Sequence, residues 1–265
     1  MTRPRPRRVG VGLLGPAGIG QAHAHAYGLI GRVLWPPSVV PRLVRVCGRQ
    51  MAKAELTRDR YDFETACERW QELVEDPAIE ALDNCAPNHL HLEPSLAAIR
   101  SGKHVFCEKP LGRTAAEARA LRDVAAQAGI VHMVGFNYRF LPAVALTRRL
   151  VDEGRLGRIH HFRARFADAS FLDPEAPFTW HQDAEASGSN ALLDLGSHLI
   201  DLARYLVGEP AAVSGAVTTF VPERTDPATG RRRRVETEDA FEATIEFAGG
   251  ALGSLAGTNM AAGRT

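Results

Sequence analysis

The sequence predicts an α/β protein with two domains, and three observations support this prediction. Apolar strand-like runs alternate with helical segments through the first half of the chain, which implies a parallel sheet covered on both faces. A glycine-rich turn follows the first of these runs. After Phe136 the pattern changes to strand-like segments that alternate in polarity, which is typical of an open, mostly antiparallel sheet with a few helices. We therefore place the domains at residues 1–136 and 137–265.

In the first domain, the apolar run Val9–Leu14 suits a buried parallel strand, and a helix is expected over Ile19–Ile30. Further strands are expected in "PRLVRVCGR", "AIEALDNCAP", "HVFCEKP" and "IVHMVGF". The helix in "HLEPSLAAIRSGK" should end at Gly102, and Thr114 should cap the helix in "TAAEARALRDVAAQAG", with Glu117 placed as in a capping box. We interpret the proline-rich patch Trp35–Pro41 as an inserted loop.

In the second domain, helices are expected over Ala143–Glu153 and Ala191–Leu206. The segment "RIHHFRARFADA" alternates like an antiparallel strand. Three more strand-like segments follow, namely "AAVSGAVTTFV", "DAFEATIEFA" and "GALGSLAGTN".

Composition excludes several classes of protein. The 265 residues are 45% apolar and 24% charged, with a net charge of +1, so no global field would draw the chain to nucleic acid or a membrane. The basic run "GRRRR" is interpreted as a solvated hairpin loop, because it lacks interleaved aromatic residues.

The sequence contains no signal-peptide pattern and no apolar run long enough to span a bilayer. The four cysteines lack metal-ligand spacing, so we expect no metal and a reducing, cytoplasmic setting.

The segment "GLLGPAGIG" lies between the first strand and the first helix, where a dinucleotide-binding Rossmann fold carries G-x-G-x-x-G. Gly15 allows the tight turn, the second position lets the backbone approach a pyrophosphate, and Gly20 lets the helix pack close to the sheet. The second position is Ala17, and the neighbouring Gly18 can restore flexibility. A purely structural glycine turn is the alternative.

The end of the second strand bears on cofactor identity. NAD-binding domains place Asp or Glu here for the ribose hydroxyls, whereas this chain has Gly48 and Arg49. A glycine leaves room, and an arginine can pair with a 2′-phosphate. The pair therefore favours NADP over NAD. The alternative is that Arg49 is an ordinary surface residue.

Asp194 and His198 form the first candidate catalytic pair. They are four residues apart on the helix expected over Ala191–Leu206, so they share one face, and they interrupt an apolar pattern. A carboxylate beside an imidazole raises its basicity and fixes its tautomer, as in a general base that removes a hydroxyl proton. Asp-x-x-x-His alone is more often structural than catalytic.

Other histidines carry less information. His23 and His25, on the first helix, are interpreted as packing or surface residues. Asn88 and His89, after Pro87, follow the carboxyl end of the third strand, where open α/β sheets bind ligands, so they are candidates for lining a cofactor site. A charge pair, Glu108 and Lys109, follows the next strand at the same edge.

Five segments taken together resemble one family. "GLLGPAGIGQAHA", "DNCAPNHLH", "GKHVFCEKPLG", "MVGFNYRF" and "LLDLGSHLIDLARYL" resemble, in order and spacing, the glucose–fructose oxidoreductase / myo-inositol dehydrogenase (Gfo/Idh/MocA) family of NAD(P)-dependent oxidoreductases. The resemblance implies an N-terminal Rossmann domain and a C-terminal sheet that often forms an oligomer interface. It implies reversible hydride transfer between a nicotinamide and a secondary alcohol of a sugar, cyclitol or related polyol. It also implies that the Lys109–Pro110 bond can be cis.

The resemblance assigns roles to residues. Lys109 matches the family's active-site lysine, Asp194 its acidic residue and His198 its catalytic histidine. The predicted substrate-binding residues are Lys109, Arg139, Trp180, His181, Asp194 and His198. The predicted cofactor-binding residues are Gly15, Ala17, Gly18, Ile19, Gly20, Gly48, Arg49, Pro87, Asn88, His89, Glu108, Lys109 and Asn137.

Two expectations concern the whole molecule. We expect a homo-oligomer, a dimer or a tetramer, formed through the C-terminal sheet. Because the family's members continue beyond the position of Thr265, we also expect the chain to be truncated or an unusually short member.

The alternative function is a nucleotide-sensing protein that keeps the fold without turnover, although such a sensor would not need Lys109, Asp194 and His198.

Overall fold

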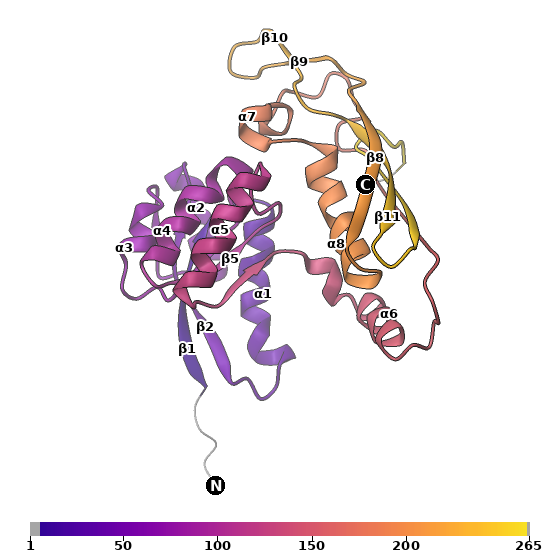
Figure 1. Ribbon diagram of the computed structural model, residues 1–265. Helices are drawn as coiled ribbons and strands as arrows, with labels where there is room; N and C mark the ends of the chain where they lie inside the picture. Colours follow the sequence, from indigo (N-terminus) through magenta and orange to yellow (C-terminus); the bar gives the residue numbers. More distant parts are fainter. Residues whose placement is uncertain (1–5, 264–265) are drawn as a thin grey trace. The chain divides into compact units, whose positions relative to one another are not determined.

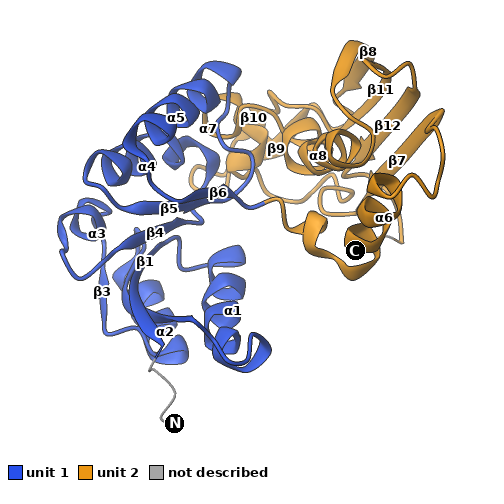
Figure 2. Ribbon diagram, turned by 60° about the horizontal axis from the view of Figure 1, so that its bottom comes forward, with its two compact units in different colours: residues 1–135 blue, residues 136–265 orange. Residues whose placement is uncertain are grey.

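A computed structural model describes residues 6–263 of the chain (Figure 1). The chain divides into two compact units, residues 1–135 and residues 136–265 (Figure 2). Each unit contains a sheet of its own, and the two are described separately below. Among the described residues, no helix combines the length and the apolar character that crossing a membrane requires.

The first unit is built on a six-stranded parallel sheet in the order β3-β2-β1-β4-β5-β6. This strand order is that of a doubly wound dinucleotide-binding fold, and it confirms the predicted α/β class. The apolar runs became strands because a parallel strand is buried on both faces; Leu13, Val46 and Leu82 are almost fully buried. The strands are β1 (Arg7–Leu14), β2 (Val39–Cys47), β3 (Thr65–Cys67), β4 (Ala81–Asn84), β5 (His104–Cys107) and β6 (His132–Val134).

The helices of the first unit connect these strands. Thr114 caps α5 by accepting a hydrogen bond from the Glu117 backbone at 3.2 Å, as predicted. The Glu117 carboxylate also accepts the backbone N–H of Arg113 at 2.8 Å and pairs with the Arg113 side chain, and a hydrogen bond from the Thr114 backbone helps to lower its pKa, as in the predicted capping box. The helices are α1 (Ile19–Val33), α2 (Met51–Tyr61), α3 (Gln71–Glu75), α4 (Leu92–Arg100) and α5 (Ala115–Ala128), with the 3₁₀ turn η1 (Asn88–Leu90).

The loop predicted over Trp35–Pro41 is shorter than expected. Strand β2 begins at Val39 and includes Pro41, which lies opposite Val9 of β1. Strand β3 pairs with Arg45 to Cys47, so within residues 6–263 the far side of β2 has no ladder partner at Pro41. A proline without an N–H is therefore tolerated at this edge position.

The second unit is built on a four-stranded sheet in the order β7-β12-β11-β8. Its antiparallel pairs are β12–β11 and β11–β8, but β7 pairs with β12 in parallel, which corrects our expectation that β7 is antiparallel. Alternation predicts a half-buried strand and carries no information about the direction of its partner. The strands are β7 (His161–Ala167), β8 (Pro210–Thr218), β11 (Ala240–Phe247) and β12 (Leu252–Thr258).

A separate hairpin carries the basic run. Strands β9 (Glu223–Thr225) and β10 (Arg232–Arg234) pair antiparallel, and the arginines of β10 are exposed. Arg233 forms an ion pair with Asp183 at 2.6 Å. The predicted solvated hairpin is confirmed.

The helix expected over Ala191–Leu206 begins with a π-helical segment, η4 (Leu192–Gly196), before α8 (Ser197–Leu206) continues. The buried Glu238 carboxylate accepts hydrogen bonds from the Asn190 and Leu192 backbones at 3.0 and 2.8 Å, so it caps the start of this segment. The α-helical spacing assumed for Asp194 and His198 is thus wrong for its first part. The other helical segments are η2 (Asn137–Phe140), α6 (Pro142–Asp152), η3 (Trp180–Gln182) and α7 (Ala184–Ser187).

Candidate functional site

The glycine turn after β1 fits a dinucleotide. Helix α1 begins at Ile19, directly after the turn Gly15–Gly18. A Cβ atom on Gly20 would lie 1.9 Å from the carbonyl oxygen of Gly15, so any side chain there would push the helix away from the turn. A glycine at position 20 thus lets the start of the helix lie close to the turn, which is the arrangement that brings a helix N-terminus near a pyrophosphate in dinucleotide-binding folds. Ala17 and Gly18 are exposed at the tip of the turn.

Gly48 has a different explanation from the one that the sequence suggested. A Cβ atom on Gly48 would lie 2.4 Å from Cγ of Pro16, so the proline of the glycine turn occupies the space beside it. An Asp or Glu at this position would collide with that ring. The glycine is therefore required by packing, and only the exposed Arg49 is left to favour NADP.

A buried histidine fastens the loop after β4 to the turn after β5. His91 faces the carbonyl oxygen of Pro110 through Nδ1 at 2.7 Å and that of Ala86 through Nε2 at 2.8 Å. Burial lowers the pKa of His91. Sequence reasoning missed this residue, although its motif "PNHLH" was noted. Of the residues predicted in that motif, Pro87 precedes η1, Asn88 is buried within it and His89 is exposed.

The turn after β5 presents Lys109. The Lys109–Pro110 peptide bond is cis, in agreement with the resemblance. The Lys109 backbone donates a hydrogen bond to Oε2 of its neighbour Glu108 at 3.0 Å. The Glu108 carboxylate is buried, whereas Lys109 is partly exposed, so only the lysine of this pair is accessible to a ligand.

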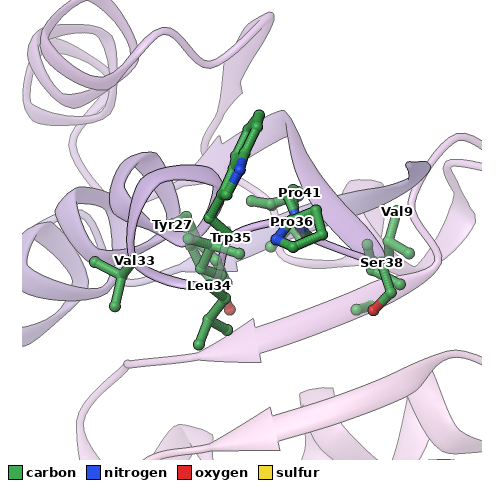
Figure 3. Close-up of a pocket in the computed structure, with 13 residues that line it drawn as sticks. Val9, Tyr27, Val33, Leu34, Trp35, Pro36, Ser38 and Pro41 are labelled. Carbon is green, nitrogen blue, oxygen red and sulfur yellow. The ribbon is translucent and has the colours of Figure 1, made fainter. Parts of the chain in front are cut away.

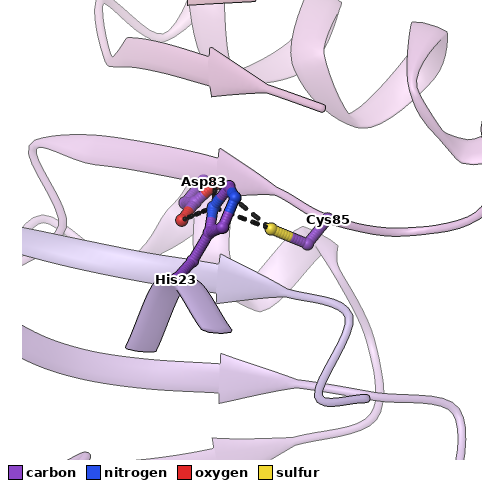
Figure 4. A group of neighbouring side chains, drawn as sticks. All are labelled: His23, Asp83 and Cys85. Atoms are coloured by element: carbon purple, nitrogen blue, oxygen red, sulfur yellow. Dashed lines mark hydrogen bonds and ion pairs between the residues drawn. The ribbon is translucent and has the colours of Figure 1, made fainter. Parts of the chain in front are cut away.

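His23, which was interpreted as a packing or surface residue, packs on Phe106 and also bridges two carboxylates, which the sequence did not indicate. Its ring lies between two carboxylates, with Nδ1 3.0 Å from Asp83 and Nε2 3.1 Å from Glu108. Figure 4 shows the imidazole of α1 facing Asp83 and Cys85. Burial acts to lower the pKa of His23, but the hydrogen bonds and charges of Asp83 and Glu108 outweigh it and raise the pKa to about 9.

In the second unit, His198 is buried among aromatic rings. Tyr138 stacks on it with ring centroids 4.4 Å apart, and Phe136 meets it edge-on at 6.1 Å. Burial and the charge of Asp194 raise the pKa of Tyr138, so the carboxylate lies close to the same ring. The structure thus places the predicted pair, Asp194 and His198, around Tyr138, which sequence reasoning did not name.

The remaining predicted residues of the second unit occupy two places. Arg139 pairs with the buried carboxylate of Asp201 at 2.7 Å and lies over the Tyr205 ring at 4.9 Å, so it fastens η2 to α8. Trp180 and His181 stack on each other in η3, with ring centroids 3.9 Å apart. Asn137 is exposed on η2.

Arg139→Ala is expected to lower the free energy of unfolding by about 1–3 kcal/mol, because it leaves the buried Asp201 carboxylate without its forked donor. Urea titration measures the change. Arg149→Ala is the matched control on α6, since its pair with Glu153 spans 3.8 Å at the surface and should contribute little. Equal effects of the two substitutions would show that the ion pair between Arg139 and Asp201 does not stabilise the fold.

The first unit also contains an apolar pocket of about 700 Å³ between α1 and the sheet (Figure 3). It is lined by residues near the beginnings of β1, β2 and β4, including Val9, Val39 and Ala81, and by Trp35. The predicted cofactor residues follow the opposite, carboxyl ends of these strands. Since open α/β sheets bind ligands at the carboxyl ends, this pocket is distinct from the candidate cofactor site.

Comparison with known proteins decides the family. Residues 9–136 match the family described as "Oxidoreductase family, NAD-binding Rossmann fold", and residues 144–265 match the "GFO/IDH/MocA C-terminal domain". This chain belongs to the Gfo/Idh/MocA family. It is an oxidoreductase with a nicotinamide-dependent Rossmann domain, as the motifs predicted.

Several relatives have known activities or structures. The chain is 39% identical to levoglucosan dehydrogenase of Pseudarthrobacter phenanthrenivorans, over 97% of this chain and 69% of that protein. It is 33% identical to scyllo-inositol 2-dehydrogenase (NADP(+)) of Bacillus subtilis, over 73% of this chain and 49% of that protein. The structure of levoglucosan dehydrogenase in complex with NADH and levoglucosan matches with a TM-score of 0.94, over 98% of this chain and 69% of that one.

Proposed function

We propose that this protein transfers a hydride reversibly between a nicotinamide and a secondary alcohol of a sugar, cyclitol or related polyol. The observation that supports this most is the conjunction of a dinucleotide turn in one unit with Asp194 and His198 around Tyr138 in the other. Relatives whose names specify dehydrogenation of levoglucosan, scyllo-inositol and D-glucoside support the substrate class.

The bound nicotinamide would accept or return the hydride. Gly15, Ala17, Gly18, Ile19 and Gly20 would hold its pyrophosphate, with Pro87, Asn88, His89, Glu108 and Asn137 as further proposed contacts. His198 would take the proton of the substrate hydroxyl, with Asp194 supporting the charge on the imidazole. Lys109 would donate a hydrogen bond to the oxygen on which negative charge develops. Arg139, Trp180 and His181 remain proposed substrate contacts.

We propose NADP or NAD as the cofactor. A relative with NADH bound supports NAD, and the relative named for NADP(+) together with the exposed Arg49 supports NADP. Since Pro16 explains Gly48, the preference for NADP depends on Arg49 alone.

Arg49→Ala is expected to raise the Kd for NADPH by about 10-fold or more while changing the Kd for NADH by less than about twofold, because one charge-assisted contact contributes about 1.5–3 kcal/mol. Fluorescence titration of each nucleotide measures both constants. Arg119→Ala, an exposed arginine on α5, is the control. If the two constants of Arg49→Ala shift equally, Arg49 does not select the 2′-phosphate.

We also propose a homo-oligomer, a dimer or a tetramer, formed through the C-terminal sheet. Strand β8 lies at the edge of that sheet, and its Val213 and Val217 are 70% and 58% exposed. An apolar edge strand is a template for association with another chain.

The four buried free thiols fit a cytoplasmic location, which stays a proposal.

The function is tested by nucleotide titration followed by turnover with a panel of levoglucosan, myo-inositol, scyllo-inositol and glucosides. Nucleotide binding and reduction with at least one polyol would support the proposal. Nucleotide binding without turnover across the panel would favour the sensing protein instead.

A further inference from the structure

His23 joins three elements that lie far apart in the sequence. It projects from α1, Asp83 belongs to β4, and Glu108 follows β5 directly. Nδ1 of the imidazole lies 3.1 and 3.0 Å from the two oxygens of Asp83, and Nε2 lies 3.1 Å from Oε1 of Glu108. The ring also stacks on Phe106 of β5, with centroids 5.1 Å apart. The imidazole is therefore held in one orientation at the carboxyl edge of the sheet.

Both ring nitrogens face a carboxylate, and each such contact needs a hydrogen on the nitrogen. The arrangement is that of an imidazolium between two carboxylates, both of which are buried. The Tyr27 hydroxyl donates a further hydrogen bond to Asp83 at 2.9 Å, and the Cys85 thiol donates to the same carboxylate at 3.4 Å. Asp83 is thus fixed by three donors, and Glu108 is oriented against it through His23.

The network ends at the proposed catalytic lysine. Glu108 binds His23 through Oε1 and accepts the Lys109 backbone N–H through Oε2. We propose that His23 is a positioning residue, which holds the Glu108 carboxylate and thereby sets the backbone from which Lys109 is presented to the substrate. This inference rests on the proposed function, because it assigns His23 a part in that reaction.

The charges around His23 support its position between the two carboxylates. The groups that face it are Asp83, Glu108 and the Cys85 thiol, with Tyr27 bound to Asp83 and Lys109 adjacent to Glu108. The pKa of His23 is raised to about 9. The stabilisation that protonated His23 gives the folded protein is therefore complete below the ordinary histidine pKa of 6.5, and it is lost as the pH rises through about 9. Burial raises the pKa of Cys85 well above its ordinary value, so the thiol stays protonated.

The test compares His23→Gln with His25→Gln, an exposed histidine on the same helix. His23→Gln cannot bridge two carboxylates as a cation, and we expect kcat to fall about 10- to 100-fold, since a misplacement of about 1 Å at a reacting group has that effect. The Kd for NADH should change by less than about fivefold, and His25→Gln should resemble the wild type. Because His23 acts through Glu108, the double variant His23→Gln/Glu108→Gln should be no slower than Glu108→Gln alone.

A second measurement does not depend on turnover. Nitrogen-15 NMR of the histidine rings at neutral pH should show both nitrogens of His23 protonated, and Asp83→Asn should lower its pKa. A neutral ring would overturn the proposal, as would an unchanged kcat in His23→Gln or additive losses in the double variant. One zinc ion per chain, retained through dialysis against zinc-free buffer and lost in Cys85→Ser, would also overturn it, because Nδ1 would then hold a metal. Absence of turnover in the wild type would instead refute the proposed function.

Discussion

Lys109→Met is expected to lower kcat by about 10²- to 10³-fold while leaving the Kd for the nucleotide within about threefold of the wild type. The ammonium group is proposed to stabilise the alkoxide that develops on the substrate, and removal of one such donor has an effect of this size. Methionine keeps the length of the side chain, and the backbone bond to Glu108 does not involve the ammonium. Steady-state kinetics with the best polyol of the panel, together with nucleotide titration, measure both quantities.

Lys53→Met is the matched control, because this lysine is exposed at the start of α2. It should retain wild-type turnover. A kcat for Lys109→Met within about twofold of the wild type would mean that another group stabilises the alkoxide.

His198→Asn is expected to reduce kcat by about 10²- to 10⁴-fold, the range for loss of a general base. Asparagine fills more of the space of the imidazole than alanine does, so the packing against Tyr138 and Phe136 is disturbed less than by alanine. Asp194→Asn should give a smaller loss, since it removes the supporting charge and leaves the imidazole. The pH dependence of kcat/KM of the wild type should show a group that must be deprotonated, and His198→Asn should abolish that limb.

The control for this prediction is His161→Asn, an exposed histidine at the beginning of β7. It should leave both kcat and the pH profile unchanged. If His198→Asn kept its acidic limb at the same pH, the general base would be a different residue.

Much of the fold could be predicted because local patterns determine it. The buried strands of the first unit are continuous apolar runs, and Thr114 caps α5 where a threonine precedes a helical pattern. The alternation in residues 158–169 predicted β7 but not its parallel pairing with β12, because the partner residues lie 91 positions further along the chain and do not affect the alternation. The Glu238 carboxylate that caps the π-helical segment Leu192–Gly196 comes from a residue 46 positions after Leu192, so no local pattern could indicate it.

The candidate site was only partly predictable, for a related reason. Lys109 and Asp194 lie in motifs whose residue types and spacing indicate chemistry. His23 gave no such signal, because its partners Asp83 and Glu108 come from β4 and the turn after β5, and only the sheet brings them together. The role of Gly48 was misread because Pro16, which occupies its space, lies on a different loop.

The most direct test of the central claim is a single-turnover experiment in which the nucleotide-saturated protein is mixed with polyol and the nicotinamide absorbance is followed. The proposed function predicts that the wild type forms reduced nicotinamide in its first turnover, and that Lys109→Met and His198→Asn bind the nucleotide equally well but form it at least about 100-fold more slowly. Equal first-turnover rates in all three proteins, or nucleotide binding without any reduction in the wild type, would contradict it.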